Sequence, residues 1–414
     1  TCALPISMGA IITGKVHNTV ASLTGAACLV LTHILSIEDC IDAVDVETIC
    51  ILVGMMLLVA VIKNSGIFEY IAIKAAKIAK GRPWPIMVIF ILITAVCSGM
   101  LDNVTTVLLV GPMTLAITNI LKVDPVPYII TQIMASNIGG TATLIGDPPN
   151  IMIGSAAKLS FVDFILNTGV ATVFVIIVGL ICMYFIYGRK LFVTDESIAK
   201  VMQLDENKAI KDRKLMHESV IVIILVALCF IFHDQLGVQS CTVAIAAACI
   251  MLLIGGQEPE EIIADVEWPT ILFFIGLFIV VGGMKKVGVI TMLANGLISI
   301  THGNMVVTMM VILWVSAIVS SFLDNIPFVA TLIPMILTMQ AEGMDVTPIW
   351  WALSLGACLG GNGTLIGASA NVVLSGISKN NGHPITFGQY FKIGFPMMIL
   401  SIIVCSVFLL VRFA

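Results

Sequence analysis

The sequence predicts an all-α polytopic membrane protein built from two inverted-topology repeats. Each repeat is expected to contain scaffold helices, a re-entrant hairpin and a broken transmembrane helix. Three observations carry this prediction: the composition, an internal repeat and the placement of basic residues. Of the 414 residues, 59% are hydrophobic and 11% are charged. Soluble domains carry about 25% charged residues, so this chain needs a lipid bilayer around much of its surface.

The apolar residues fall into runs of roughly 15–20 residues, the length that spanning helices require. Strands of an outer-membrane barrel would alternate apolar and polar residues over about 10 positions, and the sequence shows no such alternation. The first apolar stretch, Cys2–Thr13, is short for a span, so we expect either that residues precede Thr1 or that the first helix is cut. It lacks the basic leading segment and cleavage site of a signal peptide. The clearest runs are Thr19–Ile37, Thr168–Tyr187, Ser219–Phe232 and Ile393–Val411.

Two blocks of the sequence recur in the same order and at nearly the same offset. Thr94–Asn103 matches Ser316–Asn325, and both end in Leu-Asp-Asn. Gly139–Gly146 matches Gly360–Gly367, and both end in Thr-Leu-Ile-Gly. Such agreement indicates a duplication. It predicts a first repeat at 1–187, a linker at 188–218 and a second repeat at 219–414.

Basic residues predict that the two repeats lie in opposite orientations. Loop 74–82 carries four Lys or Arg residues, whereas the equivalent loop 295–304 carries none. Positively charged loops stay on the cytoplasmic side of a membrane, so these two loops are expected on opposite sides. The linker 188–218 carries seven Lys or Arg residues and is predicted to be cytoplasmic as well. The C-terminus is then outside, and we expect the chain in the cell (inner) membrane.

Each Leu-Asp-Asn block is predicted to form the tip of a re-entrant hairpin. Segment Pro85–Leu121 has arms of about 15 residues, or roughly 22 Å of helix, which falls short of the ~30 Å hydrocarbon core. The hairpin places Asp102 near mid-membrane, and its counterpart does the same for Asp324. The structural alternative makes both aspartates N-caps of the helices that follow. Because intramembrane acids usually face a cavity or a partner, a functional role is favoured.

Two glycine-rich segments are predicted to interrupt a membrane-crossing helix. They are Asn137–Asn150, within the crossing Val126–Leu159, and Gly360–Asn371 in the second half. Glycine lets the backbone leave the helix, and proline can restart one. The freed carbonyls and the side-chain oxygens of Asn, Thr and Asp are hard ligands suited to Na⁺ or another small cation. Candidate side chains are Asn137, Thr143, Asp147, Asn150, Asn362, Thr364 and Asn371.

The motifs Leu101–Thr106 and Ser136–Asn150 resemble the signatures of one branch of the ion transporter superfamily. This is the ArsB/NhaD/P-protein branch, whose citrate-transporter-like domain covers essentially the whole chain. The resemblance implies a scaffold domain that usually dimerises, and a transport domain that moves like an elevator. Dicarboxylate relatives carry a Ser-Asn-Thr motif at the hairpin tips and bind Na⁺ between the tip and the unwound loop. Carried over by position, the Na⁺ sites would involve Ser98, Asp102, Asn103, Asn137 and Gly139, and Ser320, Asp324, Asn325, Gly360 and Thr364.

Each tip departs from that motif, because an aspartate stands where those relatives have serine. A fixed carboxylate repels a dicarboxylate but suits a group that trades a proton for a cation. Asp147 is either a further ligand or an N-cap, and Ala368 replaces it in the second half, so the half-sites are not equivalent. The sequence therefore predicts a secondary active transporter, coupled to H⁺ or Na⁺, for a small ion. Na⁺/H⁺ antiport and arsenite or other oxyanion efflux both fit, and the alternatives are a dicarboxylate or citrate-type anion symporter and a passive channel.

Other functional classes have weaker support. An intramembrane aspartyl protease would pair Asp102 with Asp147, but its Gly-x-Gly-Asp motif is incomplete, because the chain reads Leu144-Ile145-Gly146-Asp147. The phosphate-binding pattern GxxxxGK[ST] is absent, so we expect no nucleotide site, no enzymatic activity and no cofactor besides the coupling ion. The net charge of −5 argues against a nucleic-acid partner. The expected partners are the lipid bilayer, a small ion or polar solute, and a second copy in a homodimer.

Overall fold

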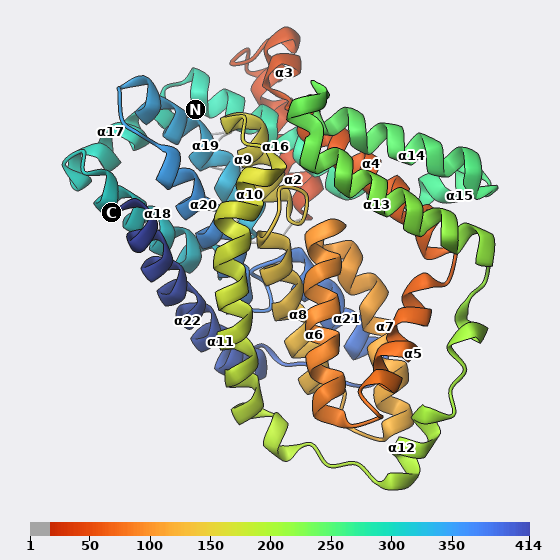
Figure 1. Cartoon of the computed structure of the whole chain (residues 1–414). Helices are drawn as coiled ribbons and strands as arrows, with labels where there is room; N and C mark the ends of the chain where they lie inside the picture. Colours follow the sequence, from red (N-terminus) through yellow and green to blue (C-terminus); the bar gives the residue numbers. More distant parts are fainter. Residues whose placement is uncertain (1–16) are drawn as a thin grey trace.

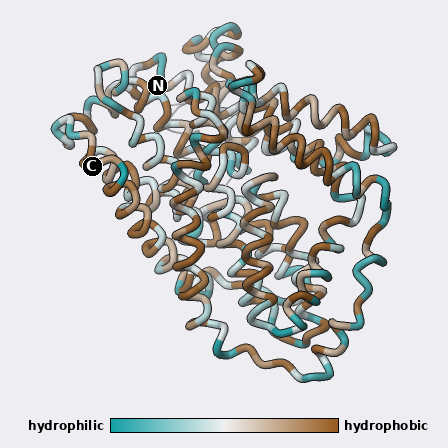
Figure 2. The backbone as a smooth tube through the Cα atoms, in the orientation of Figure 1, coloured by the Kyte–Doolittle hydropathy of each residue, from teal (hydrophilic) through white to brown (hydrophobic). Residues whose placement is uncertain are grey.

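The computed structural model describes residues 17–414, and every regular element within them is helical (Figure 1). The all-α prediction is therefore confirmed, while the stretch Cys2–Thr13 lies outside the described residues. Within that range, seven helices are long and apolar enough to cross a membrane, or eight if one bent pair counts as a single span. Figure 2 shows hydrophobic residues along the long helices and hydrophilic ones gathered on the connecting segments. The chain is an integral membrane protein.

The helices follow one order twice. The first series is α2 (Asn18–Leu31), α3 (Ile37–Ala43), α4 (Val46–Lys63), α5 (Ile67–Ile78), α6 (Pro83–Met100), α7 (Asn103–Leu121), α8 (Val126–Thr141), α9 (Pro148–Ala157), α10 (Phe161–Phe164), the π-helix η1 (Ile165–Gly169) and α11 (Val170–Ile186). The second series, preceded by α13 (Arg213–Leu236), is α14 (Ser240–Gly255), α15 (Pro259–Ala264), α16 (Trp268–Lys286), α17 (Val289–Thr301), α18 (Met305–Ser320), α19 (Asn325–Ala341), α20 (Thr347–Gly360), η4 (Gly361–Gly363), α21 (Ser369–Asn380) and α22 (Phe387–Phe413). Each helix from α2 to α9 thus has a counterpart between α14 and α21, and the continuous stretch α10–η1–α11 corresponds to α22.

Helices α2, α4, α14 and α16 form a scaffold group in which the halves exchange partners. Helix α14 packs on α4, and α2 packs on α16. Gly54 on α4 and Gly276 on α16 occupy equivalent places in the two helices. A Cβ atom on Gly54 would lie 2.7 Å from the backbone of Ala244. A Cβ atom on Gly276 would lie 2.8 Å from the backbone of Ser22. Small residues let membrane helices approach this closely. The scaffold group therefore needs both halves of the chain.

Two ion pairs show that the halves are inverted. Lys63 at the end of α4 lies 2.7 Å from Asp265, which precedes α16, and Lys286 at the end of α16 lies 2.6 Å from Asp39, shortly before α4. Equivalent helices α4 and α16 are therefore antiparallel, as the sequence predicts. Lys286 and the Ser36 backbone lower the pKa of Asp39 to about 2, so this pair keeps its charge at neutral pH.

The hairpin arms are longer than the sequence suggests. Helices α6 and α7 have 18 and 19 residues where about 15 were expected from the polar punctuation, so each is long enough by itself to cross a membrane. The contacts nevertheless place the turn between them beside the interruption of the broken helix α8–α9. The Ser98 hydroxyl donates to the Ser136 carbonyl over 2.6 Å, and the Thr143 hydroxyl donates to the Gly99 carbonyl. These partners flank the interruption between α8 and α9, so the hairpin tip reaches the middle of that broken helix.

The linker lies along one end of the molecule. It contains η2 (Gly188–Lys190), α12 (Asp195–Met202) and η3 (Glu206–Ala209), and α13 begins at Arg213, inside the predicted linker (Figure 1). Helix α12 packs on α5 and α7. Lys77 on α5 forms an ion pair with Glu206 over 2.6 Å, and the Lys211 amide donates to the Ser65 carbonyl over 3.0 Å. We call this end of the molecule the linker face.

Candidate functional site

The hairpin tips and the helix interruptions of both halves meet at the centre of the molecule. Helix α9 packs on α19, α21 packs on α7, and α8 packs on α20. Figure 1 shows the same exchange, because blue α21 lies among the orange helices of the first half and yellow α9 lies beside α19 and α20. Each hairpin therefore faces the broken helix of the other half. The sequence grouped the candidate residues within one half, and the structure combines the two groups.

A carboxamide network joins the halves. The Asn137 side-chain amide donates to the side-chain oxygens of Asn362 and Asn371, each over 2.9 Å. Its own oxygen accepts from the Asn103 side chain over 3.4 Å. All four residues are buried, and Asn137 and Asn371 are completely so. Asn137 thus connects the first hairpin tip to the interruption of the second half.

The counterpart of Asn137 in the second half is Cys358. Its thiol donates to the Asn150 side-chain oxygen over 3.5 Å, and the Ser354 hydroxyl donates to the same oxygen over 2.6 Å. The two crossing networks thus occupy equivalent places but differ in chemistry. One side presents amides, and the other presents a thiol and a hydroxyl.

Asp147 lies where the second hairpin tip meets the first interruption. It is only 1% exposed, and its two oxygens accept from the Asn325 side-chain amide over 3.4 and 3.3 Å. It stands at the N-cap position of α9, but its side chain accepts no hydrogen bond from that helix, so the alternative of a simple cap is wrong. Its extended backbone turns the carboxylate away from α9 and toward α19. The second half has only a methyl group at this place, on Ala368.

The two tip aspartates do cap their helices. Asp102 accepts from the Thr105 amide over 2.8 Å, and Asp324 accepts from the Ile326 amide over 3.1 Å. Asp324 also accepts from the Ser369 hydroxyl over 3.1 Å. Asp102 is 6% exposed, and Asp324 is half-buried. Both tip carboxylates lie near enough to Asp147 to interact with it electrostatically.

These three aspartates have no basic partner among residues 17–414. The ion pairs found there all involve other acids, on the linker, on the outer loops or at helix ends. Groups of three or more His, Cys, Asp or Glu side chains arranged to hold a metal ion are also absent from the described residues. A site for a monovalent cation would therefore have to use amide and backbone oxygens beside the carboxylates.

Several predicted ligands instead shape the interruptions. The Asn150 amide donates to three backbone carbonyls of the first interruption, and the Asn371 amide donates to two of the second. The Thr364 hydroxyl donates to the Ser321 carbonyl, as Thr143 does to Gly99. The Ser320 hydroxyl donates to the Ala357 carbonyl over 2.6 Å, as Ser98 does to Ser136. Gly139 and Gly360 lie directly against the backbones of α6 and α18. These residues hold the site in shape.

Four contributors were missed by the sequence reasoning. Ser354, Cys358 and Ser369 donate into the network, and the buried hydroxyl of Thr106, one turn after Asn103, has no hydrogen-bond partner among the described residues. Cys358 could have been found, because it occupies the repeat position of Asn137. A search for shared residues ignores positions at which the halves differ.

A family model described as "Citrate transporter" (CitMHS) matches residues 8–356 of the chain. The chain belongs to this family. Family membership agrees with the relatives found in three mycobacterial species. An uncharacterized transporter of Mycobacterium tuberculosis is 42% identical over 407 residues, which cover 96% of this chain and 94% of that protein. The "46 kDa membrane protein" of Mycobacterium leprae is 39% identical over 415 residues, with 99% and 97% covered.

More distant relatives confirm the predicted branch of the superfamily. The human P protein is 32% identical over 481 residues, which cover 96% of this chain and 57% of the P protein. The solved YdaH transporter of Alcanivorax borkumensis shares the fold with a TM-score of 0.61 at 14% identity, covering 87% of this chain and 84% of that one. The chain is therefore a membrane transporter of the CitMHS family, and these likenesses agree with a protein that is not an enzyme.

Proposed function

We propose that the chain is a secondary active transporter that exchanges a proton for a small cation at Asp147, with H⁺ or Na⁺ as the coupling ion. One observation carries the proposal: Asp147 and the two tip aspartates lie where the hairpins face the interrupted helices, close enough to interact, with no basic partner among the described residues. A charged side chain at the centre of a bilayer costs roughly 3 kcal/mol or more. A bound proton or a bound cation removes that cost. A proton and a cation bind the same carboxylate oxygens, so binding of one weakens binding of the other. The two ions therefore compete for the site and are exchanged.

The surrounding carboxamides support a cation at this place. Asn325 contacts Asp147 directly, and Asn103 and Asn137 lie on the neighbouring network. Carboxylate and amide oxygens are hard ligands of the kind that Na⁺ shares with other small cations. The helix interruptions add backbone carbonyls, as broken helices do in other secondary transporters. Transport by an elevator-like movement of the hairpins and broken helices against the scaffold group follows from the family resemblance, as does a homodimer.

Two other substrates remain as candidates. Arsenite or another oxyanion could be the cargo that the exchanged ion drives. Citrate is favoured by the family's description, but a multivalent anion beside three carboxylates is repelled unless it arrives paired with cations or protonated. A passive channel would conduct without saturation or counter-transport. By the positive-inside rule we assign the linker face and residues 74–82, which the structure places at the end of α5 and in the turn after it, to the cytoplasm, and the C-terminus to the outside of the cell membrane.

Exchange can be tested in proteoliposomes that hold a pH gradient and a pH-sensitive dye. Na⁺, Li⁺, K⁺, arsenite and citrate are added outside in turn. We expect one of the cations to produce a saturable pH change, because cation binding displaces a proton. Asp102→Asn and Asp324→Asn should lower the apparent cation affinity while some exchange remains, since asparagine keeps the N-cap. If only arsenite or citrate moves protons, cation exchange is ruled out and the solute-transporter alternative holds. A current without saturation would identify a channel.

A further inference from the structure

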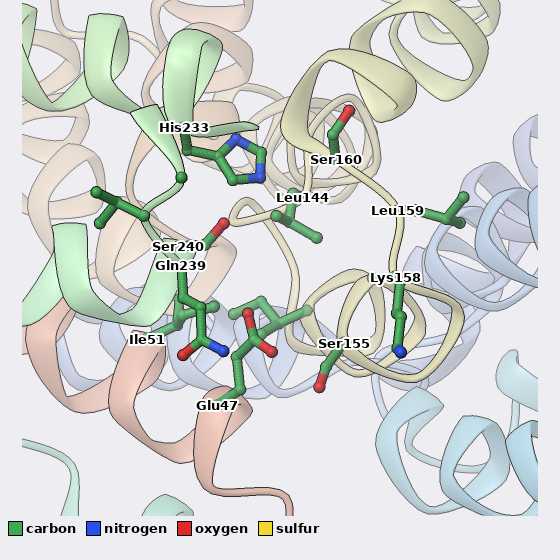
Figure 3. A pocket seen from close by; sticks show the side chains of 14 residues that line it. Glu47, Ile51, Leu144, Ser155, Lys158, Leu159, Ser160, His233, Gln239 and Ser240 are labelled. Atoms are coloured by element: carbon green, nitrogen blue, oxygen red, sulfur yellow. The ribbon is translucent and has the colours of Figure 1, made fainter. Parts of the chain in front are cut away.

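A polar cavity lies away from the aspartates, between α4, α9 and the turn that joins α13 to α14 (Figure 3). Its volume is about 290 Å³. Its polar lining comes from Glu47 on α4, Ser155 and Lys158 at the end of α9, Ser160 before α10, His233 on α13, and Gln239 and Ser240 at the start of α14. The Glu47 carboxylate points into the cavity, and Ser155 lines the facing wall on α9.

The cavity opens on the face opposite the linker. Helix α13 begins at Arg213, next to the linker, and reaches His233 near its far end. Helix α4 ends beside the linker, where Ser65 accepts a hydrogen bond from it, so Glu47 in the first turn of α4 is at the far end. Lys158 and Gln239 are exposed at the rim, so solvent reaches the cavity.

Helix α9 connects the floor of this cavity to Asp147. The floor consists of three buried aliphatic side chains, Ile51, Leu144 and Ile151. Leu144 lies over Gly154, where an added Cβ atom would meet the leucine side chain. Asp147 precedes the first residue of α9 and Gly154 is near its end, a distance of roughly 10 Å along the helix. Helix α9 therefore runs from the lining of the cavity to Asp147.

The charges around the cavity favour a cation. Glu47 lies inside it, and Asp45, the N-cap of α4, adds a second negative charge near Glu47. Against them stand His233 from α13, and Lys158 from α9, whose side chain is exposed to water. Water screens the charge of an exposed ammonium more than that of a partly buried carboxylate. The hydroxyls of Ser155 and Ser240 and the carboxamide of Gln239 supply further oxygen ligands.

We propose that this cavity is the loading site for the cation on the face opposite the linker, with Glu47 as its carboxylate ligand and Leu144 and Ile151 as the barrier in front of Asp147. The inference rests on the proposed exchange function, because it gives a second stage to the same path. Movement of α9 against α4 would open the floor, since the two helices carry opposite walls of the cavity.

The charge preference can be measured without transport. Ser155→Cys is labelled in proteoliposomes with two membrane-impermeant thiosulfonate reagents of similar size, one cationic and one anionic, and the protein without this substitution gives the background from its own cysteines. We expect the cationic reagent to react several-fold faster, and Glu47→Gln to remove most of that preference. A thiolate itself attracts the cationic reagent, so a rate ratio above one is expected at any cysteine. The quantity to compare is therefore the change in the cationic-to-anionic rate ratio that Glu47→Gln causes. Ser299→Cys, exposed on α17, is the matched control, and its reagent ratio should not respond to Glu47→Gln.

Exchange gives the second readout. Glu47→Gln should raise the cation concentration for half-maximal exchange several-fold and leave the rate at saturating cation nearly unchanged, because the central carboxylate remains. An unchanged reagent ratio at Ser155→Cys, or an unchanged half-saturating concentration, would overturn the loading site while the exchange function stood on its own assay. Absence of cation exchange in the parent protein would instead overturn the proposed function.

Discussion

Asp147→Asn is expected to abolish cation-coupled proton movement. Asparagine has nearly the same shape, and its oxygen can still accept from the Asn325 amide, so the junction between the second hairpin and the first interruption should survive. It can neither release a proton nor neutralise a cation. Loss of a charged ligand contact weakens binding by about 3 kcal/mol, or roughly 100-fold in affinity. The measurement is the saturable pH change in proteoliposomes, with the protein amount matched by quantitative immunoblot.

The contrast with another aspartate makes this result specific. Asp124 accepts a hydrogen bond from the Val126 amide at the start of α8, at the opposite end of that helix from the network, so Asp124→Asn should exchange like the parent. Asp147→Glu should retain measurable exchange with altered cation preference, because the charge is kept and its position moves. Exchange at the parental rate in Asp147→Asn would show that this carboxylate is structural. The tip aspartates would then be the remaining candidates for the coupling site.

The fold could be predicted because the features that determine it are visible in short segments of the sequence. Run length and composition identify spanning helices, and the recurrence of Leu-Asp-Asn and Thr-Leu-Ile-Gly shows the duplication. Loop charge supplies the inversion, which the ion pairs Lys63–Asp265 and Lys286–Asp39 confirm. The lengths of the helices were harder to predict, because Ser, Thr and Gly residues can lie inside a buried helix as well as at its end. Helices α6 and α7, the arms of the first hairpin, are therefore longer than the apolar runs that predict them.

The site could be predicted as a set of residues but not as an arrangement. Repeat matching compares equivalent positions, and it says nothing about which half packs against which. The bonds from Asn137 to Asn362 and Asn371, and from Asn325 to Asp147, all cross between halves. They form because α9 packs against the second hairpin and α21 packs against the first, and this packing between distant segments is not encoded in any local pattern. The Na⁺ sites drawn from the resemblance stay predictions, with several of their hydroxyls already engaged by backbone carbonyls.

Asp147 shows how a local rule can fail. An aspartate followed by two prolines at a helix start fits the pattern of an N-cap. Prolines at the first two helical positions have no amide hydrogen, however, so the helix offers fewer donors to a capping side chain. The carboxylate instead bonds the first residue of α19. The same prolines that begin α9 thus leave Asp147 available to the other half.

Gly139→Ala is expected to destabilise the protein by about 3 kcal/mol, the upper end for overpacking in a well-packed core. A Cβ atom at this position would lie 2.1 Å from the backbone oxygen of Ala95 and 2.5 Å from its Cα atom, so α6 and α8 would have to separate. Separation would also move Asn137 away from Asn103. Gly360→Ala should act in the same direction, because its Cβ atom would lie 2.6 Å from the Ala317 oxygen. The measurement is the thermal unfolding midpoint in detergent, followed by tryptophan fluorescence.

Gly376→Ala on α21 provides the matched control. It is also a glycine inside one of the two interrupted helices, but a Cβ atom there would meet no atom within 4 Å. Alanine favours a helix over glycine by roughly 1 kcal/mol, so this variant should unfold at the parental midpoint or slightly above it. A Gly139→Ala protein as stable as Gly376→Ala would mean that α6 and α8 are not in direct backbone contact. The hairpin tip would then have no fixed position beside the interrupted helix, and its approach to Asn137 would need another cause.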